Sequence, residues 1–194
     1  MSDPLDAARA ALRARQGAGA RYDAANAPAA DLALARGATA YFARILNGID
    51  DRALAAPAAG ATRAHVVAGI GLTARAQAEI LASVRQGQAE GGRLPLHAAA
   101  DPDAVALGAT LPPAALRNLI FHSTVHLDVE WRDLPDAAWD ARVADAAGTE
   151  IVIRDLPHTR AVSLWAAALN LRAGARLADV PAELRAAVAG PREQ

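Results

Sequence analysis

The sequence predicts an all-α protein, an up-down four-helix bundle with short extra helices and a small β-hairpin. Three observations support this fold class. Apolar residues recur at helical spacing in four stretches, and segments that contain glycine and proline separate these stretches. Hydrophobic residues make up 53% of the 194 residues and charged residues 21%, which is enough apolar material for one domain with its own core.

The first two bundle helices are predicted at residues 31–47 and from Thr62 to about Arg85. Asp31 is a residue type that favours the N-cap of the first helix, and Thr62 can cap the second. The first helix carries an apolar stripe at helical spacing: Leu34, Ala38, Tyr41 and Ile45.

The third helix is predicted to start at the Pro112–Pro113 pair, because proline is tolerated in a first helical turn. Its inward stripe is predicted to be Leu116, Ile120, Ser123, Leu127 and Trp131. A fourth helix at about residues 158–172 is apolar nearly all round, so we expect it to be buried among the others. Alternating apolar residues at 143–153, around a glycine, indicate a hairpin, and a last short helix is predicted at 182–189.

The domain boundaries follow from the composition of the first thirty residues. Residues 1–30 are predicted to form an arm, with a short amphipathic helix at 3–15 and a connector at 16–30. The bundle domain then covers residues 31–190. We interpret the arm as a surface segment or an extra packing helix; a dimerisation arm is the alternative, so a homodimer is compatible with the sequence.

Charge and residue usage exclude several classes of function. The net charge of −1 gives no reason to expect nucleic acid or an anionic membrane as a partner. No apolar run approaches the length that spans a bilayer, and the N-terminus lacks the apolar region of a signal peptide. Cysteine is absent, which excludes disulfides and thiolate nucleophiles. The absence of cysteine also fits a cytoplasmic protein, which we expect. All 20 basic residues are arginine, which excludes Schiff-base catalysis by lysine.

Three sequence motifs carry a resemblance to a known family. They are ALRNL at 115–119, HSTVHLDVEWR at 122–132 and ADVP at 178–181. With them, residues 32–188 resemble the N-terminal helical domain of mycothiol-dependent maleylpyruvate isomerase, of the DinB-like superfamily. The resemblance implies the DinB-like bundle, with zinc and mycothiol as the family's cofactors. The family's full-length enzyme also has a C-terminal α/β domain, which we expect to be absent here.

The resemblance also implies which positions should bind zinc. The family pattern R-E-V-W-x-H-x-V-D-L aligns with residues 162–171, and G-W-T-R-x-H-x-x-A-H aligns with residues 60–69. The ligand positions are then Ser163 in place of Glu, Ala167 in place of His and Gly69 in place of His. Zinc requires about three Cys, His, Asp or Glu donors, so we expect no metal there.

Other residues offer alternative polar sites. His122 and His126 are four residues apart on one helix, and His65 lies one turn before Gly69, so a relocated metal site is conceivable. We favour a pair of histidines at the margin of the helix. Arg63 and Arg117 are candidate anion hooks, although such arginines are more often solvated.

Two further sets of side chains are interpreted as structural. Asp128 and Arg132 are expected to form a surface ion pair, since they are four residues apart. The tryptophans are expected to lie in the core: Trp131, Trp139 and Trp165.

Two functional hypotheses follow. The first is a metal-free pseudoenzyme, a relative of the isomerase that binds a small molecule or acts as an interaction module. The alternative is a thiol-dependent maleylpyruvate isomerase or thiol transferase, using mycothiol or glutathione, with catalytic residues that the sequence does not identify. For the first hypothesis we predict a residual apolar pocket beside Gly69, Ser163 and Ala167, with His65 near its rim and Trp165 and Arg63 as further candidates.

Overall fold

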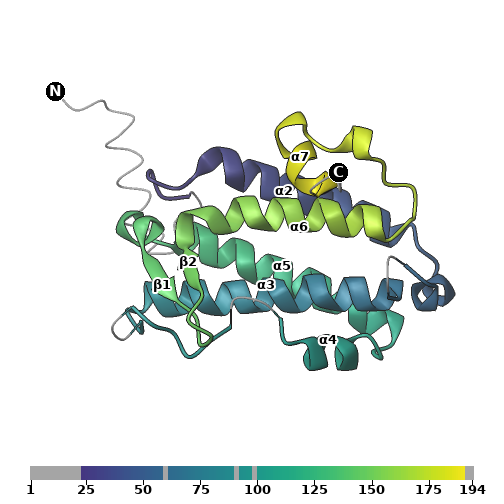
Figure 1. The fold of residues 1–194 in the computed structure, drawn as a ribbon, viewed down its shortest axis with the longest axis horizontal. Helices are drawn as coiled ribbons and strands as arrows, with labels where there is room; N and C mark the ends of the chain where they lie inside the picture. The colour runs from purple at the N-terminus through teal and green to yellow at the C-terminus, as the bar shows by residue number, and fades with distance from the viewer. Residues whose placement is uncertain (1–22, 59–60, 90–91, 98–99, 191–194) are drawn as a thin grey trace, which may run out of the picture.

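Four long helices form the bundle in the computed structural model, which describes residues 23–58, 61–89, 92–97 and 100–190. These helices are α2 (Ala29–Asn47), α3 (Arg63–Arg85), α5 (Pro113–Asp133) and α6 (Leu156–Asn170). Figure 1 shows their axes running in roughly the same line, with α3 and α5 on one side and α2 and α6 on the other. The all-α bundle predicted from the sequence is confirmed.

The helix directions do not simply alternate along the chain. Gly71 lies against Leu119, and Arg85 binds Glu130, so α3 and α5 run parallel. Trp165 stacks on Tyr41 and His158 contacts Asp31, so α2 and α6 also run parallel. The reason is the long connection 86–112, which returns the chain to the end of the bundle where α3 began (Figure 1).

Local sequence explains most helix ends, with small corrections to the predicted bounds. Thr62 accepts a hydrogen bond from the His65 N–H and caps α3 as expected. Asp31 is not an N-cap, because α2 begins two residues earlier, after Pro28, and Asp31 lies in its first turn. The helix α6 begins at Leu156, before the predicted start, since Pro157 fits a first turn.

Short elements cover the ends and one side of the bundle. The helix α4 (Pro102–Gly108) packs on α3. The predicted hairpin is present as β1 (Arg142–Ala144) and β2 (Glu150–Val152), antiparallel, with Gly148 in the turn at φ 86°. The predicted last helix is split into a 3₁₀ turn (Ala182–Leu184) and α7 (Arg185–Ala189). Four other 3₁₀ turns connect the elements: Asp51–Ala55, Asp136–Asp140, Ile153–Asp155 and Leu177–Asp179.

The core lies between the four helices. The predicted inward stripe of α5 is buried throughout, and so are Trp131, Trp139 and Trp165. The predicted arm helix at 3–15 lies outside the described residues, but the end of the connector is tied to the body. There Asp23 binds Arg36, and Asn26 contacts Asp136 and Asp140. Across the described ranges, no helix has the length and apolar character needed to cross a membrane.

Candidate functional site

The two positions on α6 that the resemblance aligns with zinc ligands lie on the face toward α3. Arg160 Nη1 donates to the Ile70 carbonyl of α3 over 2.9 Å, which fixes the orientation of this face. Ser163 and Ala167 follow Arg160 by three and seven residues, so they lie on the same face. Ser163 Oγ donates to the Thr159 carbonyl over 2.9 Å, and Ala167 is buried. Of these two positions only Ser163 has a hydroxyl, and its proton is already donated to a backbone carbonyl.

The third replaced position, Gly69, faces the short helix α4. A Cβ added there would meet Val105 Cγ1 at 3.7 Å, an ordinary van der Waals distance. The linings of the pockets at Tyr41, at Thr124 and at His122 do not include Gly69, Ser163 or Ala167. The pocket expected beside these positions stays a prediction.

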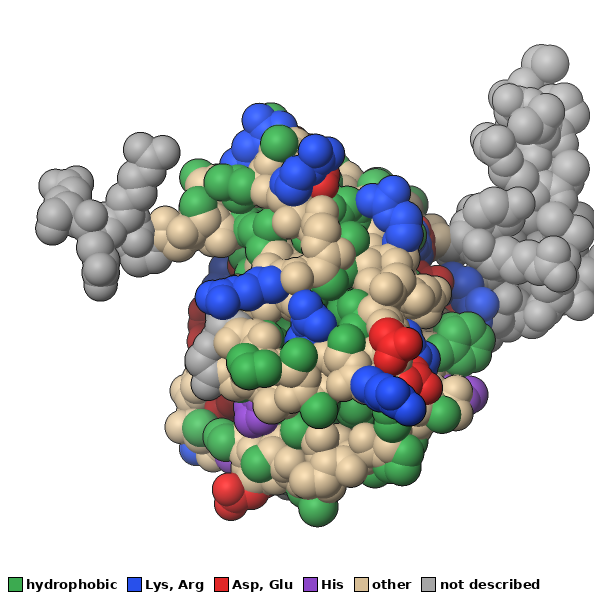
Figure 2. All heavy atoms as spheres, turned by 90° about the vertical axis from the view of Figure 1, so that its right-hand side faces the viewer, with side chains coloured by type: hydrophobic (Ala, Val, Ile, Leu, Met, Phe, Trp, Pro, Cys, Tyr) green, Lys and Arg blue, Asp and Glu red, His purple; other side chains and the backbone are tan. Residues whose placement is uncertain are grey.

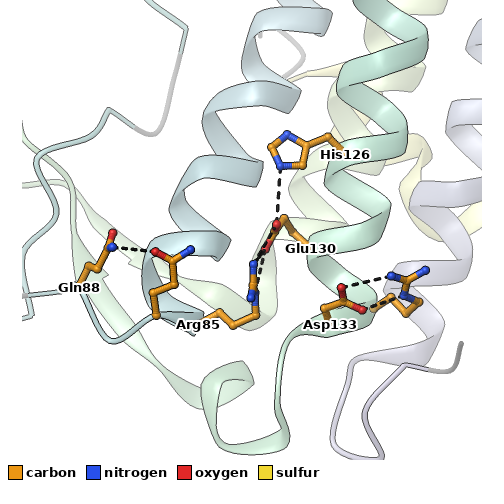
Figure 3. A network of polar contacts seen from close by, with 7 residues as sticks. Arg85, Gln88, His126, Glu130 and Asp133 are labelled. Carbon is orange, nitrogen blue, oxygen red and sulfur yellow. Dashed lines mark hydrogen bonds and ion pairs between the residues drawn. The ribbon is translucent and has the colours of Figure 1, made fainter. Parts of the chain in front are cut away.

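Of the histidines proposed for a relocated metal site, His122 and His126 line one surface pocket, and the lining of that pocket does not include His65. His122 packs edge-on against Phe121, and His126 is half-exposed, with Nε2 at 3.6 Å from Glu130 Oε1. Figure 3 shows Glu130 between His126 and the guanidinium of Arg85, which binds it through two nitrogens at 3.1 and 3.2 Å. Over the described ranges, no cluster of three or more His, Asp or Glu side chains is arranged to hold a metal ion.

The two arginines considered as anion hooks bind backbone carbonyls instead. Arg63, at the start of α3, donates to the Leu171, Arg172 and Ala53 carbonyls at 2.7–3.2 Å. Arg117, near the start of α5, donates to the Leu46 and Ile49 carbonyls, each at 2.7 Å. Because the last carbonyls of a helix lack partners and carry partial negative charge, these guanidiniums stabilise the ends of α6 and α2.

Figure 2 faces the end of the bundle on the right of Figure 1, where α2 and α6 finish. The arginine side chains on this face are interleaved with apolar and neutral side chains and do not form one basic patch.

The expected surface pair Asp128–Arg132 does not form. Asp128 instead binds Arg36 of α2 at 2.7 Å, and Arg132 binds its neighbour Asp133 at 2.8 Å. The prediction considered only partners within one helix, whereas Arg36 reaches from α2 to α5. Arg36 also binds Asp23 through two nitrogens, and this hydrogen bonding lowers the pKa of the Asp23 carboxyl.

The sequence reasoning overlooked Arg160. Its side chain is 1% exposed, and Nη2 is buried without a hydrogen-bond partner among the described residues. Burial lowers the pKa of Arg160 to about 10, so the guanidinium is still charged at neutral pH. The sequence did contain a signal: Arg160 lies in a helix that is otherwise apolar nearly all round. Such a helix is usually buried, and a charged side chain in it has little access to water.

Comparison with known proteins decides the family. The model of the mycothiol maleylpyruvate isomerase N-terminal domain matches residues 35–172. The chain belongs to this family. Among solved structures it is similar to a mycothiol-dependent maleylpyruvate isomerase and to a histidine-to-alanine mutant of such an enzyme, at 30% and 31% identity. Each match has a TM-score of 0.72 and covers 79% of this chain.

The chain covers 64% of the length of these two isomerase structures. No curated protein matches the sequence.

The family's zinc does not fit the residues at the replaced positions. Gly69 and Ala167 have no donor atom, and the Ser163 proton is given to the Thr159 carbonyl. A zinc site needs about three protein donors from Cys, His, Asp or Glu, and a neutral hydroxyl is a poor ligand. On the alignment that the resemblance implies, these three positions therefore do not supply a zinc donor set.

Trp165, the last candidate from the sequence, belongs to a polar cluster at the α2–α6 contact. Its ring lies 4.2 Å from the ring of Tyr41, centroid to centroid, and Arg44 covers Tyr41 from 4.7 Å. Tyr41 Oη donates to Asp179 over 2.7 Å. Burial, followed by this hydrogen bond, raises the pKa of the Tyr41 phenol.

Proposed function

We propose that this chain is a zinc-independent, non-catalytic member of the maleylpyruvate isomerase family that binds a small molecule. The observation that carries the proposal is the residue set Gly69, Ser163 and Ala167 at the ligand positions. The family's reaction adds a low-molecular-weight thiol to a cis double bond, and a metal favours the reactive thiolate. A chain without metal donors lacks that means of activating the sulfur.

A second candidate is a thiol-dependent isomerase in which a fixed cation replaces the metal. One observation favours it. Arg160 lies on the same face of α6 as Ser163, is buried, and keeps a charge that no described carboxylate neutralises. A buried positive charge favours an anion such as a thiolate, because the local dielectric constant is low.

Two measurements on the purified full chain separate the candidates. Elemental analysis after mild chelation is expected to find no stoichiometric zinc. A maleylpyruvate assay with mycothiol, and in parallel with glutathione, is expected to show no rate above the reaction without protein. Thiol-dependent turnover that Arg160→Met abolishes would establish the second candidate and overturn the first.

A matched control variant distinguishes a specific effect of Arg160→Met from the effect of losing any arginine. Arg142→Met removes an exposed arginine from β1, whose ion pair with Glu150 lies on the surface. Turnover that persists in both arginine variants would mean that other residues carry catalysis.

A further inference from the structure

A pocket of about 650 Å³ lies at the end of the bundle where α2 and α6 finish, the end that Figure 2 faces. The last two turns of α2 and the segment that follows α6 form its walls. We call it the α2–α6 end pocket and define it by six of its lining residues: Tyr41, Arg44, Ile45, Gly174, Arg176 and Asp179. A volume of this size is in the range that accepts a small organic molecule.

A phenol and a carboxylate bring two guanidiniums to this pocket. Tyr41 Oη donates to Asp179 Oδ2 over 2.7 Å, and Arg176 Nη2 donates to Asp179 Oδ1 over 3.1 Å. The Cζ atom of Arg44 lies 4.7 Å from the centroid of the Tyr41 ring. Both guanidiniums therefore contact the same Tyr41–Asp179 pair.

The two guanidiniums have donors that a ligand can reach from solvent. Arg44 is exposed, and it makes no hydrogen bond or ion pair with another described residue. The Arg176 side chain is 77% exposed and binds Asp179 through Nη2. Because a guanidinium has five N–H donors, most of the donors in this pocket are free among the described residues.

The lining of the pocket also has a surplus of positive charge. Its charged side chains are Arg44, Arg176 and Asp179, which together carry a charge of +1 at neutral pH. Burial raises the pKa of the Tyr41 phenol, so this group stays neutral. Arg172, two residues before Gly174, is a further exposed arginine. A monoanion therefore balances the charge of the lining.

The C-terminal ends of two helices lie near the pocket, and their free carbonyls would repel an anion. Arg63 binds the carbonyls at the end of α6, and Arg117 binds those at the end of α2. These two guanidiniums offset the negative helix ends. Arg44 and Arg176 are therefore left for a ligand.

We propose that the α2–α6 end pocket binds a small organic monocarboxylate between Arg44 and Arg176. A carboxylate matches the planar fork of a guanidinium and can accept from both side chains. The apolar part of the ligand contacts Ile45 and Ala173, which also line the pocket. Apolar side chains separate the arginines on this face, which suits a ligand with one charge and an apolar body better than a polyanion. The pocket excludes the three positions aligned with zinc ligands, so the proposal stands whether or not the proposed function is correct.

The test titrates the intact chain with a matched pair of probes and follows backbone amide signals by NMR. Benzoate carries the carboxylate, and benzamide has nearly the same shape without the charge. We expect benzoate to shift the amide signals of Gly174 and Arg176 saturably, with chloride added to equal ionic strength in every sample. Benzamide should leave these signals in place. Equal responses to benzoate and benzamide, or shifts that do not saturate, would overturn the proposal.

Variants then locate the site. Arg44→Met should weaken benzoate binding about tenfold, because a charged donor is lost, and Arg176→Met should do the same from the other side of the pocket. Arg44→Lys keeps the charge without the planar fork and should weaken binding about threefold.

Arg75→Met is the matched control, because Arg75 is also an exposed helical arginine without an ion pair among the described residues. It lines the separate pocket at His122, and its loss should leave the affinity unchanged. Benzoate binding that survives both Arg44→Met and Arg176→Met, or that Arg75→Met abolishes, would place the ligand elsewhere and overturn the proposal.

Discussion

Arg160 contacts α3 through the Ile70 carbonyl, and it also lines a pocket with residues of α2 and α5. The α3–α6 face and the region between α2 and α5 differ in whether their polar groups have partners. On the α3–α6 face, the hydroxyl of Ser163 donates to the Thr159 carbonyl and is satisfied. In the region between α2 and α5, Arg160, Thr124 and Trp131 each have a buried polar atom without a partner among the described residues. The difference teaches that the unsatisfied polar groups of this bundle do not lie at the positions that the family resemblance singles out.

The largest expected effect is the creation of a metal site at Gly69, Ser163 and Ala167, the positions that the resemblance aligns with zinc ligands. The triple variant Gly69→His, Ser163→Glu, Ala167→His should bind zinc roughly 1,000-fold more tightly than the parent, or about 4 kcal/mol. A Cβ at Gly69 would make only an ordinary van der Waals contact, so the first atom of a histidine side chain fits there. Calorimetry with zinc measures the change.

The control for this metal site keeps the volume and removes the good ligands: Gly69→Asn, Ser163→Gln, Ala167→Asn. Equal, weak zinc binding by both triple variants would break the comparison, because Gly69, Ser163 and Ala167 would then not share one site.

A second prediction contrasts two arginines that differ in their partners. Arg63→Met removes three hydrogen bonds to carbonyls and should lower the free energy of unfolding by about 2 kcal/mol. Arg160→Met removes a buried charge without a counterion and should raise it by about 1 kcal/mol when no ligand is present. Urea unfolding at neutral pH measures both. A large destabilisation by Arg160→Met would show that Arg160 is mainly structural.

A third prediction uses two glycines of α3 that are two residues apart and therefore lie on opposite sides of the helix. A Cβ at Gly71 would lie 2.7 Å from Leu119 Cγ, so Gly71→Ala should destabilise the fold by about 1–3 kcal/mol. A Cβ at Gly69 has an ordinary contact at 3.7 Å, and Gly69→Ala should stabilise the helix by about 0.5–1 kcal/mol. Thermal unfolding of the two variants gives the signs. The same sign for both would mean that the space beside Gly69 is as tight as the space beside Gly71.

The smallest expected effect concerns the opposite face of α6, where polar groups are paired. The pKa of Tyr41 is raised, so its stabilising contribution is complete below about pH 10 and declines as pH rises through the higher folded-state pKa. Ultraviolet titration of a Tyr22→Phe variant follows Tyr41 alone, since the chain has two tyrosines. Asp179→Asn should keep most of the shift, because burial is its larger cause. Titration of Tyr41 at the pKa of a free phenol would show that this face is open to water.

Sequence periodicity predicted the four long helices and the buried face of α5, because burial of one stripe is a local property of a helix. It missed the buried face of α2: of the stripe Leu34, Ala38, Tyr41 and Ile45 only Ala38 is buried, and Leu32, Ala35, Phe42 and Leu46 form the core face instead. The stripe from Leu116 to Trp131 is buried as predicted, and Thr62 caps α3. Partners across helices were not predictable in the same way. Arg36 binds Asp128, and Arg117 binds the end of α2, because the direction of α5 brings these residues together. Periodicity carries no information on that direction.

Arg160 shows the same limit for the candidate site. Its place in an apolar helix was visible in the sequence, but its unpartnered nitrogen depends on which side chains of α5 lie opposite. The replaced positions Gly69, Ser163 and Ala167 came from the resemblance to the isomerase family, and periodicity alone would not have identified them.

Because α3 and α5 run parallel, the topology of the bundle depends on the connector between these two helices. The helix α5 has 21 residues and is therefore about 31 Å long. An extended chain covers that length with roughly ten residues, and the connection 86–112 is much longer than this. A tight turn in its place would leave α5 antiparallel to α3 and would turn Arg117 away from the end of α2. The direction of α5 thus depends on the length of a loop. Shortening that loop would connect the same four helices in a different topology.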